Sequence, residues 1–339
     1  MKPTDFSYYL TDFLSKYLPG EKGASKNTID SYRDTFILFL RFLKEKENIE
    51  TEYLTLNMVT KDLIVTYLNW TEKERRCSTS TRNVRLAALH SFFQYLQYEN
   101  PDNLIEWQRI LSIPVKKAEK QTINYLTLDG IKLLLEMPDQ NTEKGRRNLA
   151  LLTLMYDTAA RVQEIIDLNP SRIRLDKPYT IKLIGKGKKA RIVPLMEPTV
   201  KILKQYMKEQ NLLETSHNSH SLFFNRSKEK LTRAGINYIL TKYKIMAREK
   251  IETLIPEKIS CHSLRHTKAM HLLQSGVNLV YIRDILGHSS VQVTEIYARV
   301  DSKQKRDAIE KAYTDVTPKE EPIWQKNDTL LNWLRKFNK

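Results

Sequence analysis

The sequence predicts a mainly α-helical protein with one small antiparallel β-sheet, arranged in two domains. Glycine is scarce, with 9 in 339 residues, and charged residues make up 28%, a composition typical of helical proteins. Within residues 179–195, two β-rich runs, TIKLI and ARIVPL, flank the segment GKGKK, which predicts a β-hairpin. Because 339 residues exceed the roughly 100–200 of one ordinary domain, we expect two domains.

Helices are expected through the first third of the chain, because apolar side chains recur there at the spacing of one helix face. They cover residues 5–18, residues 25–43 with Ser25 as the N-cap, residues 60–70, and a helix that starts at Ser80. Several short helices of this kind, with basic edges, are expected to pack as a small bundle.

The second half of the chain is expected to combine the hairpin with further helices. Thr127 is a suitable N-cap for a helix over residues 128–136. Gly276 and Gly287 stand where helices commonly end. The other expected helices cover residues 147–158, 232–250, 263–275, 279–286 and 291–298.

A polar, basic segment divides the two halves of the chain. Residues 113–124, IPVKKAEKQTIN, contain one proline and are typical of a linker. We therefore expect one domain over residues 1–112 and a second over residues 125–316. Residues 317–339 form a tail that ends in an amphipathic segment, whose apolar face needs its own domain or a neighbouring subunit to cover it.

The net charge favours a polyanionic partner. Lysine and arginine total 56 against 40 acidic residues, which gives +16, and neutralisation of phosphates supplies most of the non-specific affinity for nucleic acids. A solvated linker would carry the same charges as a linker that follows a phosphate backbone. The candidate DNA contacts are Lys116, Lys117 and Lys120 of the linker, and Arg82 and Arg85 of the helix that starts at Ser80.

Cysteine usage and hydropathy predict a soluble, cytoplasmic protein. Cys77 and Cys261 are too far apart and too few to indicate a disulfide framework, which fits a reducing compartment. The N-terminus lacks the pattern of a secretory signal. No run approaches the roughly 20 apolar residues that a membrane span requires, so no membrane partner is expected.

Four short fragments carry residues suited to phosphoryl transfer. Taken singly, each has an ordinary structural explanation, such as a surface ion pair or a solvated turn. Together they offer fixed positive charge, an acid and a nucleophile, which an anionic and slowly hydrolysed phosphodiester requires. The fragments are TAARVQE with Arg161 and Glu164, GKGKK with Lys186, HSLRH with His262 and Arg265, and the span from LGH to EIY with His288 and Tyr297.

Metal chemistry is not expected at these fragments. His262 and His266 have the i,i+4 spacing of a zinc pair, but HSLRH lacks the glutamate of HExxH and no further ligand cluster is evident. GKGKK is not a nucleotide-binding P-loop, because no GxxxxGK[ST] pattern is present. An acidic cluster suited to a two-metal nuclease is also missing.

The order and spacing of the fragments resemble the tyrosine recombinases, which include the Xer proteins, lambda-type integrases and transposon integrases. The resemblance covers residues from about 127 to 313, while SKNTIDSYRDTFILFLRFL and STSTRNVRLAALHSFFQYL resemble the family's core-binding, SAM-like domain. It implies a helical core-binding domain followed by a mixed α/β catalytic domain. It also implies a site-specific recombinase that acts on double-stranded DNA as a homotetramer on two duplexes, through a 3′-phosphotyrosine, without cofactor or metal.

The resemblance also assigns the central chemical roles. Tyr297 would attack the phosphorus and leave a free 5′-hydroxyl. Arg161 and Arg265 would bind the non-bridging oxygens, because the planar guanidinium bonds bidentately and stays charged. Lys186 would protonate the leaving 5′-oxygen, with Lys188 as the alternative.

Three further residues would support this chemistry. The resemblance implies that His262 transfers a proton at the tyrosine oxygen, that His288 hydrogen-bonds the phosphate, and that Glu164 holds neighbouring groups in place. The family usually has glycine two residues before the first arginine, where this chain has Ala159. Because alanine is small and helix-compatible, we expect no loss of function from this departure.

Other functions remain possible at this stage. A type IB topoisomerase would share the chemistry and relax DNA as a monomer, whereas the helical N-terminal half and the spacing from LGH to the tyrosine favour recombination. A catalytically inactive DNA-binding or architectural protein would not need the complete set of residues, and an RNA-binding protein is indicated by charge alone. Chromosome-dimer resolution, phage integration and transposition all stay open, as do accessory proteins.

Overall fold

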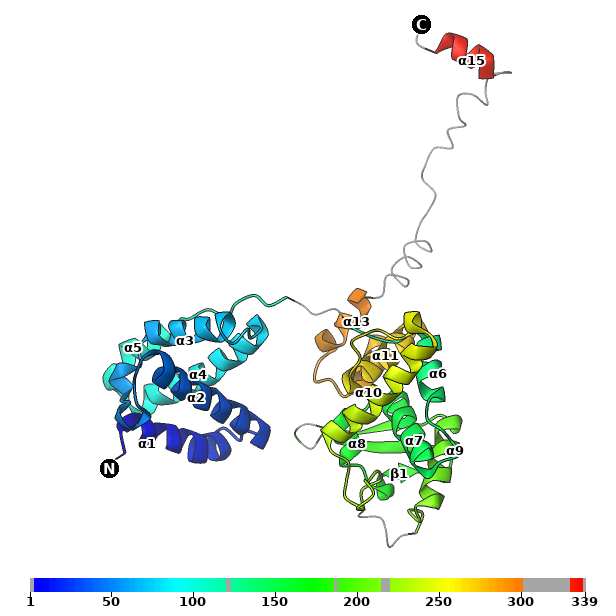
Figure 1. The fold of residues 1–339 in the computed structure, drawn as a ribbon, viewed down its shortest axis with the longest axis horizontal. Helices are drawn as coiled ribbons and strands as arrows, with labels where there is room; N and C mark the ends of the chain where they lie inside the picture. The colour runs from blue at the N-terminus through cyan, green and yellow to red at the C-terminus, as the bar shows by residue number, and fades with distance from the viewer. Residues whose placement is uncertain are drawn as a thin grey trace. The chain divides into compact units, whose positions relative to one another are not determined.

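The computed structural model describes residues 3–119, 123–185, 187, 189–214, 220–300 and 330–337. The chain divides into two compact units, residues 1–121 and 122–339, and the division falls within the segment expected to be a linker. Helices dominate both units, and one antiparallel sheet with strand order β1-β2-β3 lies in the second (Figure 1). The predicted fold class, mainly α with a small antiparallel sheet, is confirmed.

The first unit is a bundle of helices, two of which are capped by the residue at which the predicted helix begins. Ser25 accepts the backbone N–H of Thr28, and Thr60 accepts that of Leu63. The fourth helix starts earlier than predicted, because Ser78 supplies its cap. The helices are α1 (Asp5–Asp12), the π-helical segment Phe13–Glu21, α2 (Lys26–Lys46), α3 (Lys61–Lys73), α4 (Thr79–Glu99) and α5 (Leu104–Leu111).

Aromatic rings fill the core of this bundle. The ring of Phe92 lies 5.2 Å from those of Phe13 and Phe36, both edge-on, and all three are buried. Each such ring contributes roughly 1.5–3 kcal/mol through burial. Ile113 belongs to the same core, so the segment expected to be a linker begins inside the first unit.

Arg82 differs from the exposed basic face that the sequence predicted for α4. Its side chain is 4% exposed and donates a hydrogen bond to the carbonyl oxygen of Pro114. Arg85 is partly buried and donates to the hydroxyl of Thr35 on α2. Helix α4 packs on more than one side, so its arginines serve to join neighbouring segments of the unit.

The second unit surrounds an apolar helix with further helices and the sheet. Thr142 caps α7 by accepting the N–H of Gly145, so this helix begins earlier than predicted. Residues 291–298 form a 3₁₀ turn and a separate helix, where one continuous helix was expected. The helices are α6 (Leu128–Glu136), α7 (Glu143–Thr158), α8 (Val162–Ile166), α9 (Glu197–Glu209), α10 (Arg233–Lys250), α11 (Cys261–Gln274), α12 (Leu279–Leu286) and α13 (Glu295–Val300).

The predicted hairpin is present as β2 (Thr180–Ile184) and β3 (Ala190–Pro194), with β1 (Ile173–Arg174) paired to the outer edge of β2. Ile184 pairs with Ala190 at the turn end of the hairpin. Because side chains alternate along a strand, Ile181 and Leu183 enter the core while Lys182 faces outward.

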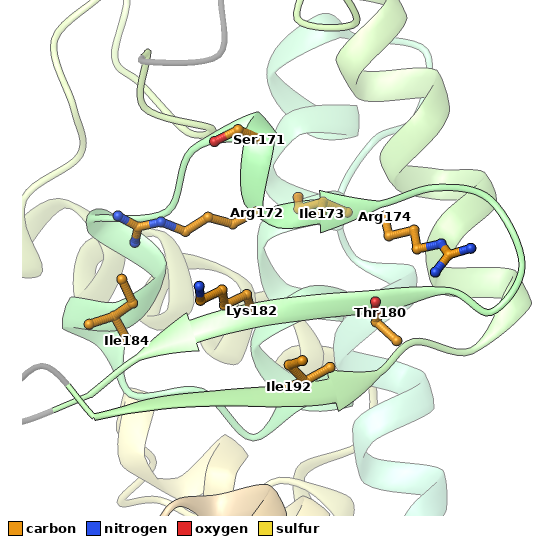
Figure 2. A pocket seen from close by; sticks show the side chains of 8 residues that line it. All are labelled: Ser171, Arg172, Ile173, Arg174, Thr180, Lys182, Ile184 and Ile192. Atoms are coloured by element: carbon orange, nitrogen blue, oxygen red, sulfur yellow. The ribbon is translucent and has the colours of Figure 1, made fainter.

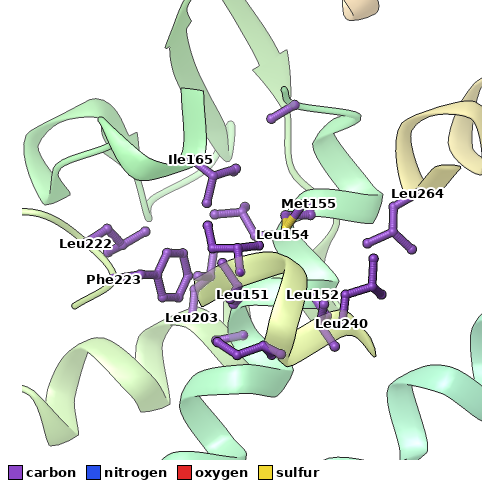
Figure 3. Close-up of a cluster of buried hydrophobic side chains, with 14 of the residues drawn as sticks. Leu151, Leu152, Leu154, Met155, Ile165, Leu203, Leu222, Phe223, Leu240 and Leu264 are labelled. Atoms are coloured by element: carbon purple, nitrogen blue, oxygen red, sulfur yellow. The ribbon is translucent and has the colours of Figure 1, made fainter. Parts of the chain in front are cut away.

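The core of the second unit forms around α7, most of whose residues are buried. Figure 3 shows Leu151, Leu152 and Leu154 of α7 among Leu203 of α9 and Leu240 of α10. Such an apolar helix is stable only when neighbours cover it on all sides. This packing holds the C-terminal end of α7 in place, and the next residues carry the first candidate arginine.

The outer face of the sheet is hollowed by a shallow pocket. Figure 2 shows Lys182 and Ile184 of β2 and Ile192 of β3 on this face, with Arg172 and Arg174 at its border. No candidate catalytic residue that the structure describes lines the pocket. The described catalytic candidates therefore lie elsewhere in the second unit.

The tail predicted over residues 317–339 is described only at residues 330–337, which include the helix α15 (Leu330–Lys336). Leu334 of this helix is 54% exposed. Within the described parts of the chain, none of the helices is long and apolar enough to cross a membrane.

Candidate active site

The predicted catalytic and supporting residues that the structure describes all belong to the second unit. Contacts of α11 with α7, α12 and α13 bring together segments that are more than 100 residues apart in the sequence. The residues are Arg161 and Glu164 at the start of α8, His262 and Arg265 on α11, His288 just after α12, and Tyr297 on α13.

Lys186 and Lys188 lie outside the described residues. Their neighbour Gly185 is described, and its backbone N–H donates to the carbonyl oxygen of Lys189 across the base of the turn. A Cβ atom at Gly185 would lie 3.1 Å from Oε1 of Glu164. The base of the hairpin turn therefore lies directly against the candidate site.

Arg161 is the N-cap residue of α8, and Glu164 bonds to it twice. The backbone N–H of Arg161 donates to Oε2 of Glu164 at 2.8 Å, and its Nη1 donates to Oε1 at 3.0 Å. Nη2 of Arg161 also donates to the carbonyl oxygen of Gly287, after α12. The arginine side chain remains 36% exposed, so part of its guanidinium faces the outside of the unit.

Arg191 of β3 is a residue of this site that sequence reasoning missed. Its Nη1 and Nη2 donate to the two carboxylate oxygens of Glu164 at 2.8 and 2.7 Å, and its Nε donates to the carbonyl oxygen of Ile285. Burial alone would raise the pKa of Glu164, but the bonds and charges of Arg191 and Arg161 hold it below its usual value. Glu164 is therefore a carboxylate shared by two arginines.

Arg265 is held almost entirely by backbone oxygens. Its side chain is 1% exposed, and Nη1 and Nη2 donate to the carbonyl oxygens of Ala159 and Leu286. Its Nε is buried and has no hydrogen-bond partner. Burial, together with the charges of Arg161 and Arg191, lowers the pKa of Arg265 to about 10, so it stays charged at neutral pH.

 Ala159 ends α7 in the left-handed region, with φ +50°, which favours glycine. The sequence-based reason for tolerating alanine, that it suits a helix, is therefore wrong, because this residue lies at a turn. The turn matters to the site because it directs the Ala159 carbonyl oxygen to Arg265.

Tyr297 is buried, with 1% of its surface exposed, and its hydroxyl bonds to a histidine that the sequence did not assign to it. The partner is Nδ1 of His266, at 2.8 Å. His262 instead packs edge-on against the ring of His266, with centroids 4.5 Å apart. Burial raises the pKa of Tyr297 to about 12, although the charges of Arg265 and Arg161 act in the opposite direction.

The histidines of the site are neutral at pH 7. Burial, aided by His262 and Arg265, lowers the pKa of His266 to about 4. Burial and the charges of Arg265 and Arg161 also lower the pKa of His288 to about 4, and they lower that of His262. Nδ1 of His288 bonds to the hydroxyl of Thr294 at 3.0 Å.

The site carries an excess of positive charge, which favours binding of an anion. Arg161, Arg191 and Arg265 face a single carboxylate, that of Glu164. The part of the chain that the structure describes contains no group of three or more potential metal ligands. The arrangement offers fixed positive charge beside a tyrosine hydroxyl, which suits attack on a phosphodiester.

The candidate DNA contacts of the first unit differ in their surroundings. Lys117 is exposed, whereas Lys116 forms an ion pair with Glu72. Arg82 and Arg85 are engaged within the bundle, as described above. Lys120 lies outside the described residues.

Comparison with known proteins gives the same picture over both units. Residues 124–304, more than half of the chain, match the model of the phage integrase family. Residues 10–100 match the N-terminal SAM-like domain of phage integrases. The chain belongs to the phage integrase family.

Relatives within the phage integrase family match along nearly the whole chain. The integrase/recombinase named y4rC from Sinorhizobium fredii is 33% identical over 96% of each chain. The tyrosine recombinase XerD of Oceanobacillus iheyensis is 30% identical over 88% of this chain and 96% of its own. The tyrosine recombinase XerC of Thermodesulfovibrio yellowstonii is 31% identical over 91% and 97%.

Solved structures share the fold of this family member. A XerH site-specific recombinase bound to a palindromic difH substrate matches with a TM-score of 0.69, at 22% identity over 87% of this chain and 82% of its own. The Tn1549 transposon integrase in complex with transposon right-end DNA matches with a TM-score of 0.68, at 15% identity over 88% and 98%. The chain is thus a tyrosine recombinase, an enzyme of DNA cleavage and rejoining.

Proposed function

We propose that Tyr297 is the nucleophile of this recombinase and forms a 3′-phosphotyrosine with one strand of double-stranded DNA. The observation that carries the proposal is the position of its hydroxyl, close enough to Arg265 and Arg161 for their charges to act on its pKa. A phosphodiester bound by these arginines would present its phosphorus beside the hydroxyl. Attack would release a 5′-hydroxyl and keep the bond energy in the phosphotyrosine.

Arg161 and Arg265 are proposed to bind the non-bridging oxygens of this phosphodiester. Arg161 is partly exposed, and Arg265 has a buried Nε without a hydrogen-bond partner, so both retain donors for a ligand. Guanidinium groups already held by backbone oxygens need little reorganisation as charge builds on the phosphorus. Glu164 and Arg191 would keep Arg161 in position.

Lys186 is proposed as the acid that protonates the leaving 5′-oxygen, with Lys188 as the alternative. The position of Gly185 against Glu164 supports this assignment, because the next residue in the turn starts beside the site. His288 would hydrogen-bond the phosphate. Since the tyrosine hydroxyl bonds to His266, we propose that His262 also contacts the phosphate rather than the hydroxyl.

The covalent adduct tests the proposed function directly. The wild-type protein and Tyr297→Phe are incubated with DNA that is nicked near the cleavage point, so that the cleaved end diffuses away and the adduct persists. We expect a protein–DNA band on a denaturing gel for the wild type and none for the variant. Footprinted binding without any adduct would reject a catalytic role and favour a DNA-binding protein.

DNA binding is proposed to depend on many phosphate contacts, with Lys116, Lys117 and Lys120 of the basic segment among them. If about 8 phosphates are contacted per protomer, the logarithm of the binding constant should fall with log salt at a slope of about −7. Binding titrations from low to moderate salt measure this slope. A response near zero would contradict DNA as the main ligand.

The active assembly is proposed to be a homotetramer on two duplexes, formed in the cytoplasm where the DNA lies. The domains would be a core-binding domain over residues 1–112, the linker, a catalytic domain over residues 125–316, and the tail. The exposed Leu334 on α15 supports docking of the tail on a neighbouring subunit. Truncation after Asp315 should weaken tetramer formation on DNA in sedimentation experiments, and unchanged assembly would contradict the docking.

A further inference from the structure

His266 contacts the reacting atom of the proposed nucleophile. We infer that His266 accepts the proton of the Tyr297 hydroxyl as the tyrosine attacks the phosphorus, and returns that proton when the strands are rejoined. The inference rests on the proposed function, because it needs Tyr297 as the nucleophile. It gives His266 a role that the motif alone did not assign.

The geometry favours His266 over the other histidines of the site. A general base must lie about 2.6–3.2 Å from the oxygen whose proton it takes, and Nδ1 of His266 lies 2.8 Å from the Tyr297 oxygen. His262 contacts the ring of His266, and His288 bonds to Thr294. Among the described residues, the Tyr297 side chain has no second hydrogen-bond partner.

The protonation states allow His266 to act as an acceptor. With a pKa of about 4, His266 is neutral, and the Nε2–H tautomer leaves a lone pair on Nδ1 for the tyrosine proton. The phenol then donates its hydrogen to His266 and keeps its oxygen lone pairs for the phosphorus. At rest the proton stays on Tyr297, whose pKa is about 12.

Substrate binding and attack would favour transfer of the Tyr297 proton to His266. An anionic phosphate between Arg161 and Arg265 would offset the positive charge that helps to lower the pKa of His266. Formation of the oxygen–phosphorus bond withdraws electrons from the phenolic oxygen and makes its proton more acidic. The transfer therefore accompanies the attack, as general-base catalysis requires.

Each bond is accounted for in both directions. In cleavage, the O–H bond of Tyr297 breaks, its proton moves to Nδ1 of His266, and the tyrosine oxygen bonds to phosphorus. The bond from phosphorus to the 5′-oxygen breaks, and that oxygen takes a proton from the proposed acid, Lys186. In rejoining, a 5′-hydroxyl returns its proton to the neutral amine of Lys186 and bonds to the phosphorus. The bond from phosphorus to the tyrosine oxygen breaks, and that oxygen recovers its proton from His266.

A pair of substitutions on α11 tests the role of His266. In His266→Asn, the amide oxygen is attached to Cγ as Nδ1 is, so it can hold the hydroxyl but cannot serve as a base. The matched control is His271→Asn, because Nδ1 of His271 bonds to another tyrosine hydroxyl, that of Tyr156, at 2.9 Å. Adduct formation is timed on the nicked substrate, after binding and circular dichroism have shown that each variant is folded and bound.

We expect His266→Asn to slow adduct formation by about 100-fold or more, the usual contribution of a general base. His271→Asn should stay within about threefold of the wild type. The rate of His266→Asn should also keep rising with pH, while that of the wild type levels off once His266 is neutral. The groups that face His266 and shape this profile are His262, Arg265, His288 and Tyr297.

A second substrate distinguishes the acid at the leaving 5′-oxygen from the base at Tyr297. Replacing the leaving 5′-oxygen by sulfur removes the need for an acid, so it should rescue Lys186→Ala but leave His266→Asn slow. Rescue of His266→Asn by sulfur, or a rate within about threefold of the wild type on ordinary DNA, would overturn the inference. Failure of the wild type itself to form an adduct would instead reject the proposed function.

Discussion

Two histidines of α11 each form a hydrogen bond to a tyrosine hydroxyl through the Nδ1 atom. His266 bonds to Tyr297 at 2.8 Å, and His271 bonds to Tyr156 at 2.9 Å. The tyrosines lie on different helices, Tyr297 on α13 and Tyr156 on α7. The same hydrogen bond therefore occurs twice in one unit, in two different surroundings.

The second ring nitrogen distinguishes the two histidines. Nε2 of His271 donates to the carbonyl oxygen of Leu126, which fixes the tautomer and joins α11 to the segment before α6. The hydrogen bonds of the described residues give Nε2 of His266 no such partner. His271 is thus hydrogen-bonded at both nitrogens, as a structural residue is, whereas the hydrogen bonds of the described residues hold His266 at Nδ1 alone.

The charges that act on the pKa values of the two phenols differ in sign. Burial raises the pKa of both tyrosines, but Asp157 raises that of Tyr156 further, while Arg265 and Arg161 lower that of Tyr297. Negative charge on the phenolic oxygen is therefore disfavoured at Tyr156 and supported at Tyr297. The surrounding charges decide which of two similar hydrogen bonds can take part in chemistry.

Removal of each hydroxyl should give the largest difference between the pairs. Tyr297→Phe should abolish the covalent adduct, because phenylalanine has no hydroxyl to attack the phosphorus. Tyr156→Phe should retain adduct formation within a few-fold and lower stability by about 1 kcal/mol through its lost hydrogen bond. Denaturing gels and thermal unfolding of both variants check this, and an adduct with Tyr297→Phe would break the comparison.

Arg191 provides the next test, because it bonds to Glu164, the carboxylate that also holds Arg161, without contacting Tyr297. In Arg191→Gln, Glu164 would lose two of its hydrogen bonds and draw Arg161 more strongly toward itself. We expect cleavage to slow by about 10- to 100-fold, the effect of displacing a catalytic group slightly.

The matched control for Arg191 is Arg146→Gln, which breaks an ion pair with Glu209 on a more exposed part of the same unit. Exposed pairs contribute little, so this variant should cleave at nearly the wild-type rate. Single-turnover rates at saturating protein separate the chemical step from DNA binding. Equal cleavage rates for Arg191→Gln and Arg146→Gln would show that Arg191 does not contribute to cleavage.

Stability should fall in acid because of the histidines in the site. The pKa values of His266 and His288 are about 4 in the folded protein, below the roughly 6.5 of the unfolded chain. A lowered pKa contributes stability that is present above pH 6.5 and is lost as the pH falls toward 4. The Tm should drop by several degrees over this range, and the drop should be smaller in His266→Asn.

The residue types of the site were predictable because phosphoryl transfer restricts them. His262 and Arg265, spaced i,i+3, share a face of α11, whereas Arg161 is the N-cap of α8 and bonds to Glu164 from outside the helix. The bonds between elements were not predictable from spacing. Whether a side chain reaches across to another helix depends on the tertiary path of the chain.

Two residues of the site, Arg191 and His266, were missed although the sequence carries a signal for each. Arg191 belongs to the strand ARIVP, where alternation with the buried Val193 places it on the inner face of the hairpin. His266 stands next to Arg265 in HSLRH, where it was considered only as a zinc ligand. For Arg82 the sequence misled, because it predicted an exposed position for a side chain that is buried. Helical periodicity does not reveal a helix that is covered on several sides.

The smallest expected effect concerns the turn at Ala159, which lies close to both histidine–tyrosine pairs. Ala159 follows Tyr156 by three residues and packs in the same apolar cluster as Tyr297. Because its φ is +50°, Ala159→Gly should remove strain of about 1–2 kcal/mol, partly offset by the greater entropy of glycine in the unfolded chain. The net gain of about 0.5–1 kcal/mol should raise the Tm slightly.

Ala160→Gly is the matched control for this turn, since Ala160 is not among the residues with positive φ. It should lower the Tm, because glycine adds entropy to the unfolded chain without relieving strain. Opposite shifts in the two variants would show that the turn between the pairs is strained by alanine. Shifts of the same sign would mean that the left-handed backbone at this position costs little, and that the glycine usual in the family serves close packing instead.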